Sequence, residues 1–167
     1  MKNPLFLYLH LLLLSLLAAT ASAQLTAKEG ARGPDTNALT YPNAIDPKAV
    51  GSYPKVVKSG GGVFYDEVLE YRVWVFGEDG DTFKAFATFE EAEKFSKHTK
   101  GAEEPLVLVR QFEHVNEPSP GIFEHKKETR LAEWRVSWLP SSKRLPDSIE
   151  KYIASGGKVK NGVLRKK

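Results

Sequence analysis

Hydrophobic and polar residues alternate most regularly over residues 68–76. The apolar side of this segment consists of Leu69, Tyr71, Val73 and Val75. The other side carries Glu70, Arg72 and, toward its end, Trp74 and Phe76. A period of two is typical of a β-strand with one buried face. We therefore predict a strand here whose second face is polar in its middle and partly covered at its end.

A second strand and a helix follow this strand. Residues 77–81 combine glycine with acidic residues, which indicates a turn, so residues 82–87 are predicted to complete a hairpin. Thr88 and Glu91 have the spacing of a capping box at the start of a helix. The apolar face of that helix consists of Phe89, Ala92 and Phe95. The helix is predicted to end near Thr99.

The remaining elements complete an α+β pattern. Residues 106–112 and 130–139 are predicted strands, the latter with Trp134, Val136 and Trp138 on one face. A turn is expected over 117–121, an optional extra strand over 122–126 and a short helix near 147–154. The order β-β-α-β-β-α predicts an α+β fold with a small antiparallel sheet of four to five strands and one main helix packed on one face.

The chain begins with the pattern of a secretory signal. Lys2 precedes an apolar run over residues 5–17, and Ala21-Ser22-Ala23 has the small residues of a signal-peptidase site. We expect residues 1–23 to be a signal peptide cleaved after Ala23, with a retained N-terminal anchor as the alternative. No transmembrane segment is expected after cleavage, because the run is too short to span a bilayer. The protein is then exported, either to the periplasm or out of the cell.

The rest of the chain divides into three segments. Residues 24–62 are rich in proline and glycine and are expected to form a loosely attached arm or linker. Residues 63–157 contain 14 aromatic residues, enough for the core of one α+β domain. Residues 158–167 contain five basic residues and no acidic one. They form the basic tail.

Charge and composition exclude several classes of function. Residues 63–157 carry 13 basic and 18 acidic residues, a net charge of −5, so no nucleic-acid partner is expected. The basic tail, at +5, is expected to make weak contacts with anionic surfaces. The absence of cysteine excludes disulfides, thiolate metal sites and a cysteine nucleophile. The common serine-hydrolase, zincin and dinucleotide motifs are also absent, and the identity of any cofactor stays unknown.

Four polar residues around the turn at 117–121 form a candidate metal or polar cluster: His114, Glu117, Glu124 and His125. Imidazole and carboxylate groups are ligands for zinc and similar cations. If Asn116 faces Ile122, His114 lies opposite Glu124, whereas a shift of one residue places the two histidines side by side. The alternative is a pair of solvated surface histidines.

Glu70, Arg72 and Trp74 form a candidate pocket on the second face of the first strand. Glu67, Glu70 and Glu133 are also candidate paired carboxylates for acid–base chemistry, or else ion-pair partners of nearby arginines. Residues 59–62 (Ser-Gly-Gly-Gly) suggest either a phosphate cradle or a flexible hinge. The hinge fits better, because the segment leads into a strand rather than a helix.

Several segments resemble a family of short bacterial proteins that are labelled GNAT-type acetyltransferase-like or left uncharacterised. They are residues 60–74, 85–92, 101–106, 117–121 and 133–139. The resemblance covers about residues 60–140 and implies an acetyl-CoA-dependent N-acetyltransferase. It carries no assigned catalytic residue onto this chain.

Three functions therefore stay open from the sequence. The first is an exported module that binds a protein partner or a small-molecule ligand, without catalysis supported by a motif. The second is the N-acetyltransferase that the resemblance implies. The third is a metal binder that uses His114 and His125.

Overall fold

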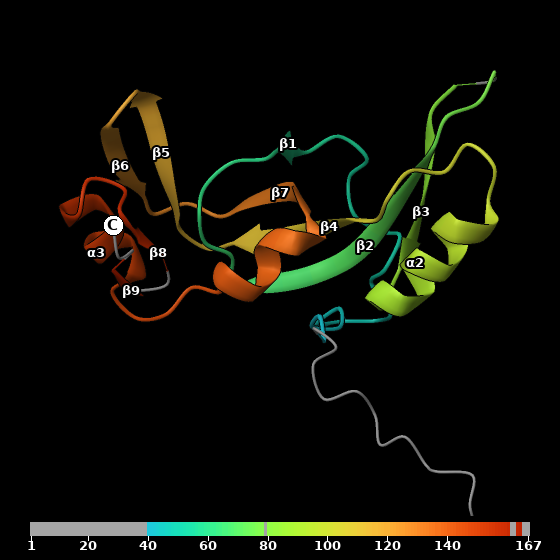
Figure 1. Ribbon diagram of the computed structural model, residues 1–167, viewed down its shortest axis with the longest axis horizontal. Coiled ribbons are helices and arrows are strands. Elements are labelled where there is room, and N and C mark those ends of the chain that lie inside the picture. Colours follow the sequence, from blue (N-terminus) through green and yellow to red (C-terminus); the bar gives the residue numbers. More distant parts are fainter. Residues whose placement is uncertain (1–39, 79, 161–162, 165–167) are drawn as a thin grey trace, which may run out of the picture. The chain divides into compact units, whose positions relative to one another are not determined.

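The computed structural model describes residues 40–160, except residue 79, together with residues 163–164. Its largest element is a five-stranded sheet of order β1-β7-β4-β2-β3 (Figure 1). The strands are β1 (Lys58–Ser59), β2 (Glu67–Val75), β3 (Thr82–Phe86), β4 (Leu106–Gln111) and β7 (Arg130–Arg135). The predicted α+β class is confirmed. The sheet is mixed rather than antiparallel throughout, because the short β1, which the sequence did not reveal, runs parallel to β7.

The main helix, α2 (Phe89–His98), begins as the sequence predicts. The Thr88 side chain accepts a hydrogen bond from the Glu91 amide, and the Glu91 carboxylate accepts one from the Thr88 amide. This capping box satisfies amides that the first turn of a helix leaves without partners. The helix packs on one face of the sheet through Ala92, which is fully buried, and through Phe89 and Phe95.

The core lies on the face of the sheet that α2 covers. Its buried members include Tyr71 and Val73 from β2, Val107 and Val109 from β4, and Ala132 and Trp134 from β7. The register of β2 against β4 shifts between Val68 and Glu70. This irregularity offsets the alternation, so Val68 joins the core cluster with Tyr71, while the buried Leu69 lies outside it, contrary to the simple alternation expected.

The predicted last strand is too long. β7 ends at Arg135, and residues that were expected to continue it form the 3₁₀ helix η1 (Val136–Ser141). Arg135 pairs with Leu106, which is the first residue of β4, and Pro105 has no amide hydrogen to extend the ladder. The chain therefore turns over the core face, where Leu139 is buried and Trp138 packs edge-on against Trp134.

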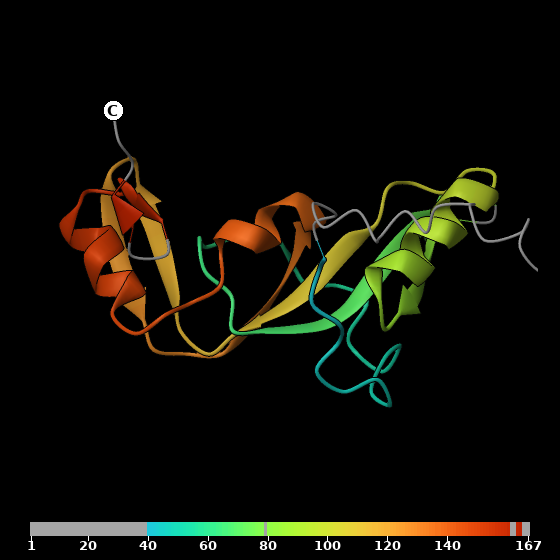
Figure 2. The same ribbon diagram turned by 60° about the horizontal axis from the view of Figure 1, so that its bottom comes forward.

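A second, smaller core joins a hairpin to a helix. Strands β5 (His114–Ser119) and β6 (Ile122–Lys126) form a two-stranded sheet beside α3 (Ser148–Ala154), as Figures 1 and 2 show. Phe64, Val115 and Ile149 are its buried members, with Phe123 and Tyr152 packed against them. The optional strand over 122–126 and the short final helix are thus both present. A further pair, β8 (Val159–Lys160) and β9 (Val163–Leu164), lies near the C-terminus.

Residues 40–57, which we call the strap, are more closely attached than the loose arm expected from the sequence. The Ala44 amide donates to the Ala87 carbonyl, and the Ile45 amide donates to the Val68 carbonyl. The Tyr71 hydroxyl donates to the Pro42 carbonyl at 2.6 Å. The strap therefore runs past the end of β3 and contacts β2. The boundary expected at residue 63 stays a prediction, but loose attachment of residues 40–57 does not agree with these contacts.

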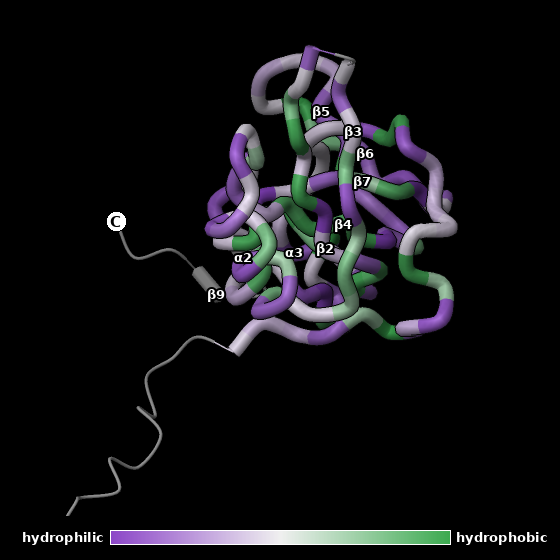
Figure 3. The backbone as a smooth tube through the Cα atoms, turned by 90° about the vertical axis from the view of Figure 1, so that its right-hand side faces the viewer, coloured by the Kyte–Doolittle hydropathy of each residue, from purple (hydrophilic) through white to green (hydrophobic). Residues whose placement is uncertain are grey.

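The hydropathy of the described chain follows this architecture. In Figure 3 the loop between β2 and β3, at the top of the view, is partly white and partly purple, whereas apolar stretches in green run through the sheet. No helix among residues 40–160 and 163–164 is long and apolar enough to cross a membrane. The predicted signal peptide at residues 1–23 and the last three residues of the basic tail lie outside the described residues.

Candidate functional site

The candidate pocket residues Glu70 and Arg72 lie together on the second face of the sheet. Two residues apart on β2, they project from the same side of the strand. Arg72 Nε donates to Glu70 Oε1 at 2.7 Å, and neither side chain is exposed to solvent. The guanidinium also lies over the ring of Phe83, 4.4 Å from its centroid. Burial of two charges is favourable only where close pairing and further hydrogen bonds replace their hydration.

Glu133 completes this polar cluster from β7. Its Oε2 lies 3.2 Å from Arg72 Nη1, and its Oε1 accepts a hydrogen bond of 2.9 Å from the indole of Trp74. The structure thus brings together all three residues of the candidate pocket and adds one of the candidate carboxylates. Glu67, the other carboxylate, pairs instead with Arg110 at 2.6 Å.

The strap covers this cluster, so the residues do not line an open pocket. Arg72 Nη2 donates to the Pro54 carbonyl at 2.9 Å, and the Gly51 amide donates to Glu70 Oε2 at 2.6 Å. Every strong donor and acceptor of the pair is occupied by protein. The cluster holds the strap on β2, and the strap occupies the space that a reacting substrate would need.

The four residues of the candidate metal cluster are not brought together. The register pairs His114 with Lys126, a shift of one residue from the pairing that would align the two histidines, and Asn116 with Glu124. Glu124 pairs with Lys126, and Glu117 accepts a hydrogen bond from the Gly121 amide across the turn. Among the described residues, no group of three or more histidine, aspartate or glutamate side chains is placed to hold a metal ion.

His114 is buried inside the hairpin rather than solvated. Its side chain is 5% exposed, and Nδ1 lies 3.2 Å from the Glu128 carbonyl oxygen. Burial, with the nearby charge of Arg130, lowers the pKa of His114, although the contact with Glu128 opposes this shift. The imidazole is therefore held neutral, which suits a structural position in a small core.

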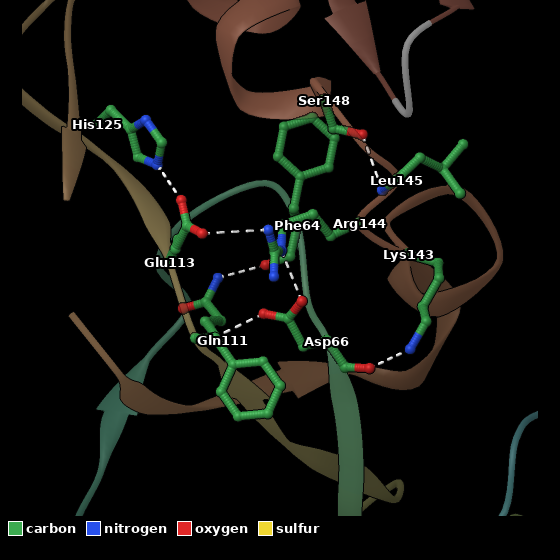
Figure 4. Close-up of polar contacts among 10 residues, drawn as sticks. Phe64, Asp66, Gln111, Glu113, His125, Lys143, Arg144, Leu145 and Ser148 are labelled. Atoms are coloured by element: carbon green, nitrogen blue, oxygen red, sulfur yellow. Dashed lines mark hydrogen bonds and ion pairs between the residues drawn. The ribbon is translucent and has the colours of Figure 1, made fainter. Parts of the chain in front are cut away.

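His125 takes part in a separate chain of charged groups (Figure 4). Its Nε2 lies 2.5 Å from Glu113 Oε2, and Arg144 lies 3.5 Å from the other oxygen of Glu113. Arg144 Nε donates to Asp66 Oδ1 at 2.6 Å, and Asp66 Oδ2 accepts from the Phe112 amide. These contacts connect the hairpin and the segment before α3 to the residues that flank β2 and β4. The role of this chain of charged groups is therefore structural: it holds these segments together.

The residues after β1 do not fit a pyrophosphate cradle of the kind an acetyl-CoA site would need. A Cβ at Gly62 would lie 2.6 Å from Gln111 Nε2 and 2.7 Å from Arg130 Nη2, so the protein's own side chains fill this loop. The segment leads into β2, whereas phosphate cradles open helices whose amides face the anion. The acetyltransferase resemblance stays a prediction, and no step is derived through acetyl-CoA.

The best candidate for a binding site is a half-open groove of about 900 Å³ between α2 and the start of η1. Its apolar lining comes from four separate segments, through Tyr41, Phe89, Leu106 and Val136. Tyr41 packs edge-on against Phe89, with 4.7 Å between ring centroids. Since the first three of these side chains stay partly exposed, a ligand can reach an apolar floor.

The rim of the groove carries charges that the described part of the chain leaves unpaired. Glu93 and Lys97 on α2 form an ion pair of 2.9 Å. Glu103 and Glu104, which precede β4, make no side-chain hydrogen bond or ion pair with any described residue, and the same holds for Arg135 at the end of β7. All three are exposed. Two unpaired acids and one unpaired base therefore flank the apolar floor.

Comparison of the chain with protein-family models, curated proteins and solved structures gives no significant match. The candidate site therefore rests on the geometry of the chain itself.

The sequence missed the groove. The groove depends on Tyr41 meeting Phe89 and on the chain turning at Arg135, and both are tertiary features. One signal was available: Glu103-Glu104-Pro105 places two acids and a helix-breaking residue directly before an apolar strand. The sequence did indicate attachment of the strap through Tyr41 and Tyr53, two aromatic residues in a proline-rich segment.

Proposed function

We propose that this protein is an exported binding module that holds a segment of a partner protein in the groove between α2 and η1. The observation that carries the proposal is the pair of unpaired carboxylates, Glu103 and Glu104, beside the partly exposed floor residue Leu106. The occupant is a peptide segment with one or two bulky apolar side chains. In the bound peptide, a lysine or arginine contacts Glu103 and Glu104, and an acidic residue contacts Arg135.

The open shape of the site, rather than its volume, favours a peptide over a small molecule. Small ligands bind in concave pockets that bury most of their surface. Here the groove is half-open, and its walls are charged side chains with freedom to reorient. Apolar anchors in a pocket with a charged rim are typical of protein–protein contacts, in which the floor gives affinity and the rim gives specificity.

Export supports this proposal through residues 1–23, with Ala21-Ser22-Ala23 as the cleavage signal. Mass spectrometry of the protein recovered from the periplasm or culture medium should give a mature chain that begins at Gln24. A soluble cytoplasmic protein that retains Met1 would contradict export.

Selection from a phage-displayed library of random dodecapeptides tests the binding function. Peptides enriched on the mature chain should contain bulky apolar residues next to lysine or arginine. Enrichment should disappear on a Glu103→Lys, Glu104→Lys double variant and persist on Glu117→Lys, which changes an exposed acid on β5. A library that yields no enrichment, or the same peptides on all three proteins, would overturn the proposal.

A further inference from the structure

The strap is held on β2 by side chains that contact its backbone. Arg72 donates to two consecutive strap carbonyls, to Pro54 at 2.9 Å and to Lys55 at 3.4 Å. Glu70 accepts from the Gly51 amide at 2.6 Å. A guanidinium presents several donors in a fixed plane, and a carboxylate presents acceptors, so the pair is complementary to the carbonyls and amides of an extended chain.

These contacts do not depend on the identity of most strap side chains. Pro54, Lys55 and Ser52 are exposed, and Val56 is 87% exposed. The Lys55 ammonium donates to the Asp81 carbonyl at 2.6 Å and lies over the ring of Trp74, 5.6 Å from its centroid. The cluster therefore binds the backbone of an extended segment, and it favours a lysine or arginine directly after a proline.

Lifting this part of the strap uncovers a face that carries charged groups and the fully buried Leu108, which lies between Glu70 and Glu133. The side chains beneath it include Glu70, Arg72 and Glu133, all of which water can solvate. Segments with few buried apolar contacts open at a small fraction of the global free energy of unfolding.

We propose that the face of β2 carrying Glu70 and Arg72 is a second peptide-binding site, which residues 51–55 occupy within the same chain. An extended, proline-containing segment of a partner protein, with a lysine or arginine after the proline, takes their place. This inference does not rest on the groove. Neither Glu70 nor Arg72 lines the groove.

Exchange of the strap tests the proposal directly. A protease site inserted after the exposed Val56 allows the folded, mature protein to be nicked, which converts residues 24–56 into a separate fragment. A fluorescent peptide of residues 40–56 should then replace that fragment, with a rise in anisotropy. The unlabelled peptide of residues 48–56 should compete with it.

Two methylated peptides provide the matched control. N-methylation of Gly51 removes the amide that Glu70 accepts and should weaken binding by about tenfold, because the lost bond involves a buried charge. The same methyl group on Tyr53, whose amide makes no hydrogen bond in the described structure, should leave binding within about threefold. Glu70→Gln should also weaken the unmodified peptide.

Three results would overturn the proposal. The first is unfolding of the protein on nicking, judged by circular dichroism, since the strap would then be part of the core. The second is a nicked fragment that never exchanges. The third is equal weakening by the two methyl groups, since the binding would then not follow the contact with Glu70.

Discussion

Arg72 Nε and Glu70 Oε1 lie 2.7 Å apart with both side chains completely buried, so the two charges stabilise each other in place of water. Removing one partner leaves the other charge buried without compensation. Arg72→Met should therefore lower the free energy of unfolding by about 3–5 kcal/mol. Urea denaturation followed by tryptophan fluorescence measures this loss.

The control for this variant is Arg110→Met. Arg110 pairs with Glu67 at 2.6 Å, but both side chains stay partly exposed, at 31% and 24%. Its loss should cost less than about 1 kcal/mol. Similar losses for the two variants would show that burial does not distinguish the two ion pairs.

His114 should make stability depend on pH. Burial lowers the pKa of His114 in the folded state, with a further contribution from Arg130. The unfolded state then binds more protons below about pH 6.5, the ordinary pKa of histidine. The free energy of unfolding should accordingly fall as the pH drops through this value, and continue to fall until the lower pKa of the folded state is passed.

His114→Gln should flatten this dependence between pH 7.5 and pH 5, measured by urea denaturation at each pH. His98→Gln, at an exposed position near the end of α2, should retain it. Parallel pH profiles for the wild type and His114→Gln would show that another group is responsible.

The capping box of α2 offers a local test of stability. Thr88→Ala removes the acceptor for the Glu91 amide and should cost about 1 kcal/mol. Thr129→Ala, at an exposed loop position, should change stability by less than about 0.5 kcal/mol. Thermal denaturation by circular dichroism compares the two, and an unchanged melting temperature for Thr88→Ala would exclude a role for the cap.

The two neighbouring tryptophans should differ strongly in their contribution to the core. Trp134 is 2% exposed and Trp138 is 40% exposed, although their rings lie 6.0 Å apart. Trp134→Ala leaves a large cavity in the sheet and should cost about 3–5 kcal/mol. Trp138→Ala should cost clearly less in the same urea experiment, since solvent already reaches that ring. A larger loss for Trp138→Ala than for Trp134→Ala would contradict the assignment of Trp134 to the core.

The elements that could be predicted from the sequence are those whose signals are local. Alternation identifies β2, and the Thr88–Glu91 spacing identifies the start of α2, because strand faces and helix caps involve residues a few positions apart. The same alternation correctly placed Glu70, Arg72 and Trp74 on one face, and the structure shows them in one hydrogen-bonded cluster with Glu133.

The features that escaped prediction depend on contacts between distant residues. β7 ends at Arg135 because its partner β4 begins at Leu106, which the sequence of β7 cannot reveal. The hairpin register separates His114 from His125 because the β5–β6 pairing is offset by one residue from the pairing that would join them. The strap has the composition of a linker because backbone hydrogen bonds supply most of its contacts, and only Tyr41 and Ala44 add apolar packing against the core.

The central claim is that the groove selects peptides by the charges of its rim, and a reversal of charge tests it most directly. The probes are two fluorescent pools of pentapeptides. One has two Lys/Arg residues, two of Leu, Ile or Phe, and a final Glu, and the other has the opposite charges in the same order. Fluorescence anisotropy compares their affinities for the wild type and for a triple variant, Glu103→Lys, Glu104→Lys and Arg135→Glu. We expect at least about a tenfold preference of the wild type for the first pool, and of the triple variant for the second. Equal affinities for both pools, or the same preference in both proteins, would contradict the claim.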